Sequence, residues 1–246
     1  MRRRIIGIVW KLAVVVGVWF LLTQRASIPA GSLLTSVRGE QVSREEVIAI
    51  ARSYAEHHWQ ATAANIRHGR DGSGVAVQTP DEPAGPAHPN RWQLGQPNMG
   101  MPYKWGGFDT PASFDAGLRS AKAAGDLYSF AKRRAGDKAV SDEAVGIDCS
   151  GFISRCWKLP AKLGTATLPG ICRRLDSAAD LQSGDIMDIP HQHVLLFSHW
   201  LNDSKSHALF YEAEGDRHAK VVAREHALWE LRLLGAKPLR YARILD

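Results

Sequence analysis

The chain has 246 residues, of which 45% are hydrophobic and 23% charged. This length and composition fit one sizeable globular core with elaborations and exclude wholesale disorder. Three Cys exclude a disulfide scaffold and a four-Cys zinc site. The net charge of +6 lies at the N-terminus: residues 1–25 carry five basic residues and no acid, whereas the remainder holds 26 basic and 25 acidic residues. We therefore expect no nucleic-acid partner.

The N-terminus has the pattern of an export signal. Three arginines precede residues 5–22, which are apolar except for Lys11. Residues 1–30 are predicted to be a signal peptide, cleaved after Ala30, or an N-terminal membrane anchor that spans the bilayer through residues 5–22. A buried core helix is the alternative interpretation. If the segment is an export signal of either kind, the rest of the chain faces an extracytoplasmic space, the cell envelope or periplasm, as an anchored or secreted protein.

Residues 31–100 are predicted to hold one helix and a long loop. Ser43 and Glu46 form a capping box before apolar residues at helical spacing, which predicts a helix over about 44–60. Residues 69–100 contain 11 Gly and Pro in 32 positions, a density that predicts a segment without regular structure. Such a loop is usually functional and could cover a cleft.

Residues 101–246 are predicted to form an α+β domain. Helical spacing recurs over 113–140, and a further helix starts at about Cys149 and ends before Pro160. Short strands are expected near 181–187, 193–197, 209–213, 221–222 and 241–245. Helices followed by strands indicate an antiparallel sheet.

A cysteine at the start of a helix has a chemical consequence. The helix dipole and the unpaired backbone N–H groups favour the thiolate of Cys149, which is the nucleophilic form. Such a nucleophile needs a neighbouring base that is held by a third group. The alternative for Cys149 is a buried structural thiol.

Four separated blocks resemble the NlpC-type cell-wall cysteine peptidases in the order that this family has them. They are PYKWGG at 102–107, DCSGFI at 148–153, SGDI at 183–186 and HVLLF at 193–197. The resemblance covers about residues 100–245. It implies a papain-like fold, in which a helix with the nucleophile packs on an antiparallel sheet with the base, and cleavage of amide bonds in peptidoglycan peptides, typically beside a D-amino acid.

The resemblance also assigns site residues. Cys149 matches the nucleophile and His193 the general base. Tyr103 matches an aromatic residue whose hydroxyl lies near the nucleophile and helps the oxyanion site or the substrate, although core packing beside Trp105 is the alternative. Asp148 and Ser150 match positions that contact the amino end of the substrate peptide.

The chain departs from the family pattern in two places. About forty residues separate the Tyr103 block from Cys149, and we expect them to form an inserted helical hairpin near the cleft. The third catalytic residue is usually a His on the next strand, where this chain has Glu212. A carboxylate can accept the imidazole N–H and hold its tautomer, so Glu212 is the candidate.

Several alternatives stay open. His191 shares a strand face with His193, and Glu214 shares one with Glu212. Cys156 and Cys172 either form a disulfide or are simply buried.

A metal site made of His191, His193, His199, His207 and Cys149 lacks ligand spacing, so neither a metal nor another cofactor is expected. The rival functions are acyl transfer or amide hydrolysis on the same Cys–His fold, and a non-catalytic module that binds wall peptides.

Overall fold

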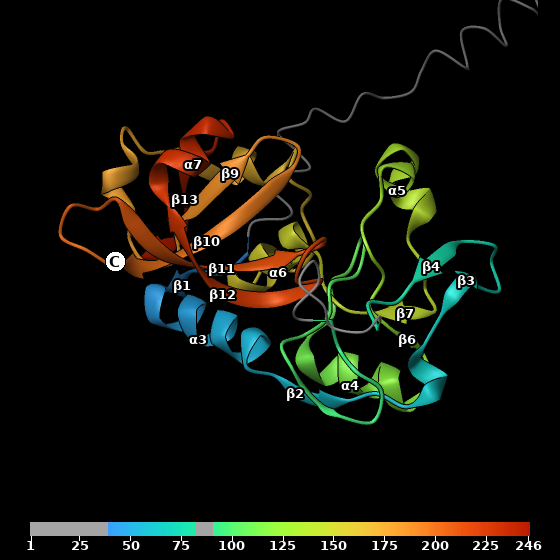
Figure 1. Ribbon diagram of the computed structural model, residues 1–246. Coiled ribbons are helices and arrows are strands. Elements are labelled where there is room, and N and C mark those ends of the chain that lie inside the picture. The colour runs from blue at the N-terminus through green and yellow to red at the C-terminus, as the bar shows by residue number, and fades with distance from the viewer. Residues whose placement is uncertain (1–38, 82–90) are drawn as a thin grey trace, which may run out of the picture. The chain divides into compact units, whose positions relative to one another are not determined.

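A computed structural model describes residues 39–81 and 91–246, which belong to one compact unit (Figure 1). The signal or anchor predicted for residues 1–30 lies outside the described residues. Among the helices of 39–81 and 91–246, none has the length and apolar character that crossing a membrane requires.

The centre of the fold is a six-stranded antiparallel sheet with the order β12-β11-β10-β9-β13-β8 (Figure 1). The predicted apolar run after His193 is buried in this sheet, as are β9 and most of β11. The α+β class and the antiparallel sheet expected from the sequence are therefore confirmed. The strands are β8 (Cys172–Arg174), β9 (Ile186–Ile189), β10 (His193–Trp200), β11 (His207–Glu214), β12 (Lys220–Ala227) and β13 (Lys237–Tyr241).

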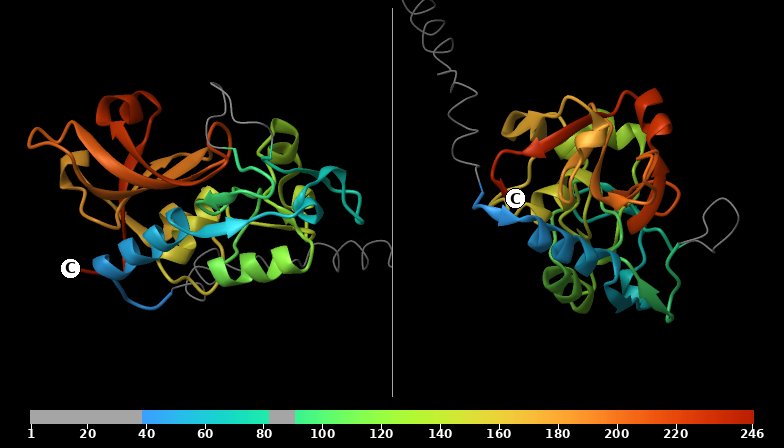
Figure 2. Two further views of the ribbon diagram at one scale, coloured as in Figure 1. Left: turned by 60° about the horizontal axis from the view of Figure 1, so that its bottom comes forward. Right: turned by 90° about the vertical axis from the view of Figure 1, so that its left-hand side faces the viewer.

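Three helices cover the sheet. Helix α6 (Cys149–Cys156) packs on β10 and β11, and α3 (Arg44–Ala55) packs on α6 and β12. Helix α7 (Leu228–Leu233) lies on the other side of the sheet from α3 (Figures 1 and 2). The capping box of Ser43 and Glu46 begins α3 as predicted. The helix ends at Ala55, earlier than the expected residue 60.

Residues 102–107 lie directly beside the start of α6. Lys104 N–H donates to the Ile147 carbonyl at 3.1 Å, and Ile147 N–H donates to that of Pro102 at 3.1 Å. The roughly forty residues between the Tyr103 block and the Cys149 block therefore form an insertion whose two ends lie next to each other. Gly107 makes this approach feasible, because a Cβ there would lie 2.5 Å from the carbonyl oxygen of Gly146.

Residues 58–81 and 91–145 build a smaller set of elements next to the sheet. They form two antiparallel pairs, β2–β5 and β3–β4, and the parallel pair β6–β7. The elements are β2 (His58–Gln60), η1 (Ala63–Asn65), β3 (His68–Arg70), β4 (Ala76–Gln78), β5 (Pro97–Met99), α4 (Pro111–Arg119), β6 (Ala123–Ala124), α5 (Phe130–Ala135), η2 (Gly136–Ala139) and β7 (Ala144–Val145). The remaining short elements are β1 (Val42–Ser43), which pairs with β14 (Ile244–Leu245), and η3 (Leu168–Ile171) and η4 (Ala178–Asp180).

Two expectations for this region are wrong. Residues 69–100 contain strand residues: β3 and β4 form a hairpin whose turn holds Gly72 and Gly74, and Gly74 has a φ of +80°. The helical hairpin expected over 113–140 is two separate helices with β6 between them. Lys132 of α5 is buried against Asp126 with a 2.5 Å ion pair.

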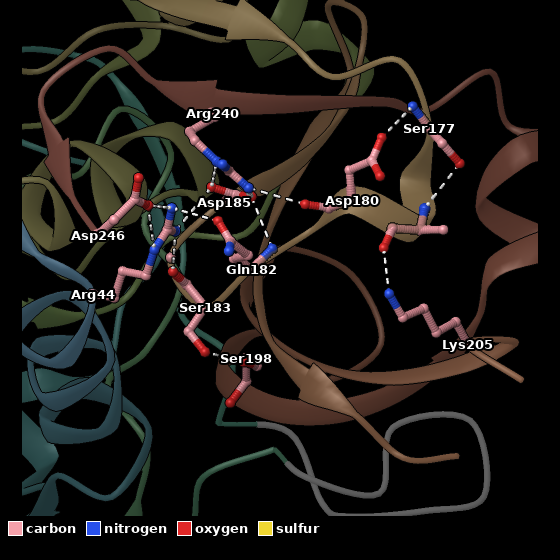
Figure 3. Close-up of polar contacts among 12 residues, drawn as sticks. Arg44, Ser177, Asp180, Gln182, Ser183, Asp185, Ser198, Lys205, Arg240 and Asp246 are labelled. Atoms are coloured by element: carbon pink, nitrogen blue, oxygen red, sulfur yellow. Dashed lines mark hydrogen bonds and ion pairs between the residues drawn. The ribbon is translucent and has the colours of Figure 1, made fainter. Parts of the chain in front are cut away.

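The block at 183–186 has a structural role. Asp185 is fully buried and accepts hydrogen bonds from Arg240 Nη2 at 2.7 Å and from Arg44 Nη1 at 3.2 Å. Figure 3 shows both arginines converging on this carboxylate, with Asp246 on the far side of Arg44. One side chain thus connects α3, β9 and β13.

Candidate active site

Cys149 is the first residue of α6, as the sequence predicts. Asp148 is the N-cap: its carboxylate accepts the N–H of Gly151 at 2.7 Å, and its carbonyl accepts that of Phe152 at 2.8 Å. The thiol is 8% exposed and lines a cleft. The positive end of the helix dipole and the backbone N–H groups of Cys149 and Ser150 therefore lie next to the sulfur.

The sheet brings His193 and Glu212 together. Phe197 of β10 pairs with Phe210 of β11, and both lie an even number of residues from the polar pair, so His193 and Glu212 project from one face. His193 Nε2 lies 2.7 Å from Glu212 Oε2. Nε2 is therefore occupied, which leaves Nδ1 as the ring nitrogen available to Cys149, a residue that stabilises the charged ring.

The three groups form an electrostatic unit. Burial alone would lower the pKa of His193, but Cys149 and Glu212 stabilise the imidazolium and raise that pKa to about 10. Burial would raise the pKa of Glu212, but hydrogen bonds from His193 and His226 hold it well below its usual range. Glu212 is thus an ionised carboxylate at neutral pH, only 2% exposed.

Tyr103 lines the cleft together with Cys149. Its ring packs on Gly215 so closely that a Cβ added at residue 215 would lie 2.7 Å from the ring. Burial, together with Cys149 and Asp148, raises the pKa of Tyr103 well above its usual value. Its hydroxyl therefore stays protonated and can donate a hydrogen bond.

The cleft consists of two adjoining cavities that share Cys149. One, of about 330 Å³, includes His193 and Glu212, and the other, of about 200 Å³, includes Asp148 and Ser150. Residues of the α5 segment form a wall of both, and Arg133 Nη2 ties this wall to the β9–β10 turn by donating to the His191 carbonyl at 3.0 Å. The shared lining residues are Tyr103, Tyr128, Arg133, Cys149 and Gln192.

Asp148 and Ser150 make contacts within the protein. Ser150 Oγ donates to Asp148 Oδ1 at 3.0 Å, while the other oxygen of Asp148 pairs with Lys162 Nζ. Both residues are at least nine-tenths buried. These contacts cap α6 and fix Lys162 at the edge of the cleft.

The structure separates the alternatives left by the sequence. His193, not His191, meets Glu212, and the carboxylate of Glu214 accepts the N–H groups of Arg217 and His218 instead. Cys156 and Cys172 are both free, so the disulfide is wrong. Within residues 39–81 and 91–246, no cluster of three or more His, Cys, Asp or Glu is arranged to hold a metal ion.

The sequence analysis missed four polar residues near the site. Lys162 and Arg133 come from loops and an insertion, where spacing carries no signal. Arg224 and His226 alternate along β12, a pattern that marks one face of a strand but names no partner.

No family model matches the chain, and searches of curated proteins and of solved structures found no similar protein.

Proposed function

We propose that this protein is a cysteine peptidase of papain-like fold that hydrolyses amide bonds in cell-wall peptides. The observation that supports this most is His193, which lines one cavity with Cys149, lies 2.7 Å from the carboxylate of Glu212, and has its charged form stabilised by both residues. A helix N-terminus beside an imidazolium that is paired with a buried carboxylate is the setting in which cysteine nucleophiles act.

The reaction has two halves. The Cys149 thiolate attacks the scissile carbonyl carbon, and the negative charge that develops on oxygen is held by backbone N–H groups at the start of α6, with the Tyr103 hydroxyl as a further donor. His193 gives its proton to the leaving amine as the C–N bond breaks, which leaves an acyl-enzyme. His193 then takes a proton from water, whose oxygen attacks the thioester and releases the thiolate.

The substrate class is supported by the resemblance and by the cleft. Three of the four blocks shared with the NlpC-type peptidases contribute lining residues: Tyr103, Cys149 and His193. The fourth block fixes the scaffold through Asp185. The basic and apolar sequence of the N-terminus supports an extracytoplasmic location in the cell envelope, which the protein would reach by secretion or with an anchor in residues 5–22.

Mass spectrometry of peptidoglycan fragments incubated with the purified protein tests the proposal. New amine and carboxyl ends are expected with the wild type and are lost in Cys149→Ala, whereas Cys172→Ala, a matched change of another thiol, retains them. Transfer of an acyl group to an acceptor amine would instead establish an acyltransferase. Binding without turnover would establish a wall-binding module, and neither binding nor turnover would refute the proposal.

A further inference from the structure

Glu212 has a partner on each of its two oxygens. His193 Nε2 lies 2.7 Å from Oε2, and His226 Nε2 lies 2.8 Å from Oε1. Arg224 Nη1 is 3.4 Å from Oε1 as well. A carboxylate held from both sides cannot turn without breaking a hydrogen bond, and its charge is balanced where water has little access.

The position of His226 is set by the sheet. β12 pairs with β11 so that Ala208 lies opposite His226 and Phe210 opposite Arg224, which puts both basic residues on the face of Glu212. The Phe210 ring packs edge-on against the His226 ring at 5.8 Å, and the side chain of His226 is 14% exposed. The ring is therefore fixed in the orientation that meets Oε1.

We propose that His226 is a positioning residue, which donates a hydrogen bond to Glu212 Oε1 and thereby keeps Oε2 against His193 and the Nδ1 atom of His193 against Cys149. Its effect on turnover rests on the proposed function, but its effect on the thiol does not. Without this hydrogen bond the carboxylate can rotate away, the imidazolium is less stable, and Cys149 loses part of the positive charge that supports its reaction as a nucleophile.

Other charged or titratable groups also face this unit. They come from α5, from the segments before α4 and α5, from the end of β11, from the β11–β12 turn and from β12: Arg133, Tyr103, Tyr128, Glu214, Asp216, His218 and Arg224. A substitution of His226 alone removes none of these groups.

Three substitutions of His226 isolate the hydrogen bond. His226→Phe keeps a ring against Phe210 and removes the donor, and His226→Asn keeps polarity but is too short to reach Glu212. His226→Gln can place an amide N–H near the position of Nε2. His199→Leu, at an exposed histidine of β10, is the control.

The first readout is the rate at which iodoacetamide alkylates Cys149 in the full-length protein as a function of pH, which needs no substrate. Near pH 6.5, we expect His226→Phe and His226→Asn to slow alkylation about tenfold, because the imidazolium beside Cys149 is less stable. His226→Gln and His199→Leu should stay within about twofold of the wild type. If the Phe variant does not fold, as its melting curve will show, the Asn variant provides the test.

The second readout is turnover of wall peptides. We expect the Phe and Asn variants to lower kcat about tenfold with KM nearly unchanged, by analogy with the loss seen when the hydrogen-bond partner of a metal-binding histidine is removed. In a Glu212→Gln background, His226→Phe should add no further loss, because His226 acts through Glu212.

Three results would overturn the inference. The first is a His226→Gln variant that loses as much alkylation rate or kcat as His226→Phe, and the second is a His199→Leu variant that loses as much as the His226 variants. The third is a loss of kcat in the double variant that equals the sum of the losses from Glu212→Gln and His226→Phe. If the wild type cleaves no wall peptide but alkylation behaves as expected, the positioning role stands and the proposed function fails. If the wild type cleaves wall peptides and alkylation is unchanged in all three variants, the proposed function stands and the positioning role fails.

Discussion

At the scale of single residues, burial distinguishes the three cysteines. Cys156 is fully buried and Cys172 partly so, and burial raises the pKa of both thiols. Cys149 alone lines the cleft and has an imidazole beside it. The chemical difference between these thiols therefore comes from their surroundings, since the side chains are identical.

This difference predicts selective alkylation. At pH 7 iodoacetamide should modify Cys149 at least about tenfold faster than Cys156 or Cys172, because only the thiolate reacts. Peptide mapping by mass spectrometry measures the three rates in one sample. His193→Gln should remove most of the advantage of Cys149, and three equal rates in the wild type would remove the basis for an activated nucleophile.

The raised pKa of His193 makes stability depend on pH. A group whose pKa rises on folding, here from 6.5 to about 10, binds its proton more tightly in the folded state. Its contribution is complete below about pH 6.5 and is lost as the pH rises through 10. The difference in unfolding free energy between the wild type and His193→Gln should therefore shrink between pH 6.5 and 10, as measured by urea denaturation. A constant difference would mean that His193 is not a stabilised cation.

At the scale of elements, the start of α6 depends on glycine. The N-terminal turn of this helix lies against residues 106–107, so closely that a Cβ at Gly151 would lie 2.2 Å from the carbonyl oxygen of Gly107. The Gly107 carbonyl belongs to the backbone and, unlike the end of a flexible side chain, cannot move aside easily. The glycines in these two blocks are thus needed to bring Tyr103 and Cys149 into one cleft.

Gly151→Ala tests this packing. Helix propensity alone would favour alanine by about 1 kcal/mol, but the collision should outweigh it and cost about 1–3 kcal/mol or more, with a lower kcat as Cys149 shifts. Gly164→Ala, at an exposed site with nothing within 4 Å of the added Cβ, should leave stability nearly unchanged. Urea unfolding compares the two, and equal stabilities would refute the tight approach.

At the scale of the whole molecule, Asp185 connects segments far apart in sequence. Arg44 begins α3 and Arg240 lies in β13, and both reach the same buried carboxylate. This network fixes α3 and β13 on the sheet that carries His193 and Glu212. The helix with Cys149 packs between α3 and that sheet, so the network supports the site at a distance.

Asp185→Asn should therefore destabilise the whole fold. Loss of the charge leaves Arg240 buried without its partner, which costs about 3–5 kcal/mol. Asp246→Asn removes an exposed partner of the same Arg44 and should cost less than about 1 kcal/mol. The midpoints of urea unfolding measure both, and equal losses in the two variants would mean that Asp185 is not the connecting residue.

Local patterns in the sequence were enough for the elements and for part of the site. The capping box of Ser43 and Glu46, the helix that starts at Cys149 and the antiparallel class follow from nearest-neighbour chemistry and periodicity, which need no tertiary information. His193 and Glu212 were candidates because the resemblance to the NlpC-type peptidases aligns them with the general base and the third catalytic residue, whereas strand alternation left His191 and Glu214 open as alternatives. The strands in residues 58–100 were missed, because glycine and proline content cannot distinguish a loop from a hairpin with a Gly-rich turn.

What the sequence alone determined is the set of reactive groups: a thiol at a helix start, an imidazole and a carboxylate on neighbouring strands. Only the tertiary structure chose His193 over His191, left Cys156 and Cys172 unpaired, and placed His226 on Glu212. These outcomes depend on which residues face each other across strands and loops far apart along the chain. Spacing along one chain cannot specify such distances, whereas the register of a packed sheet does.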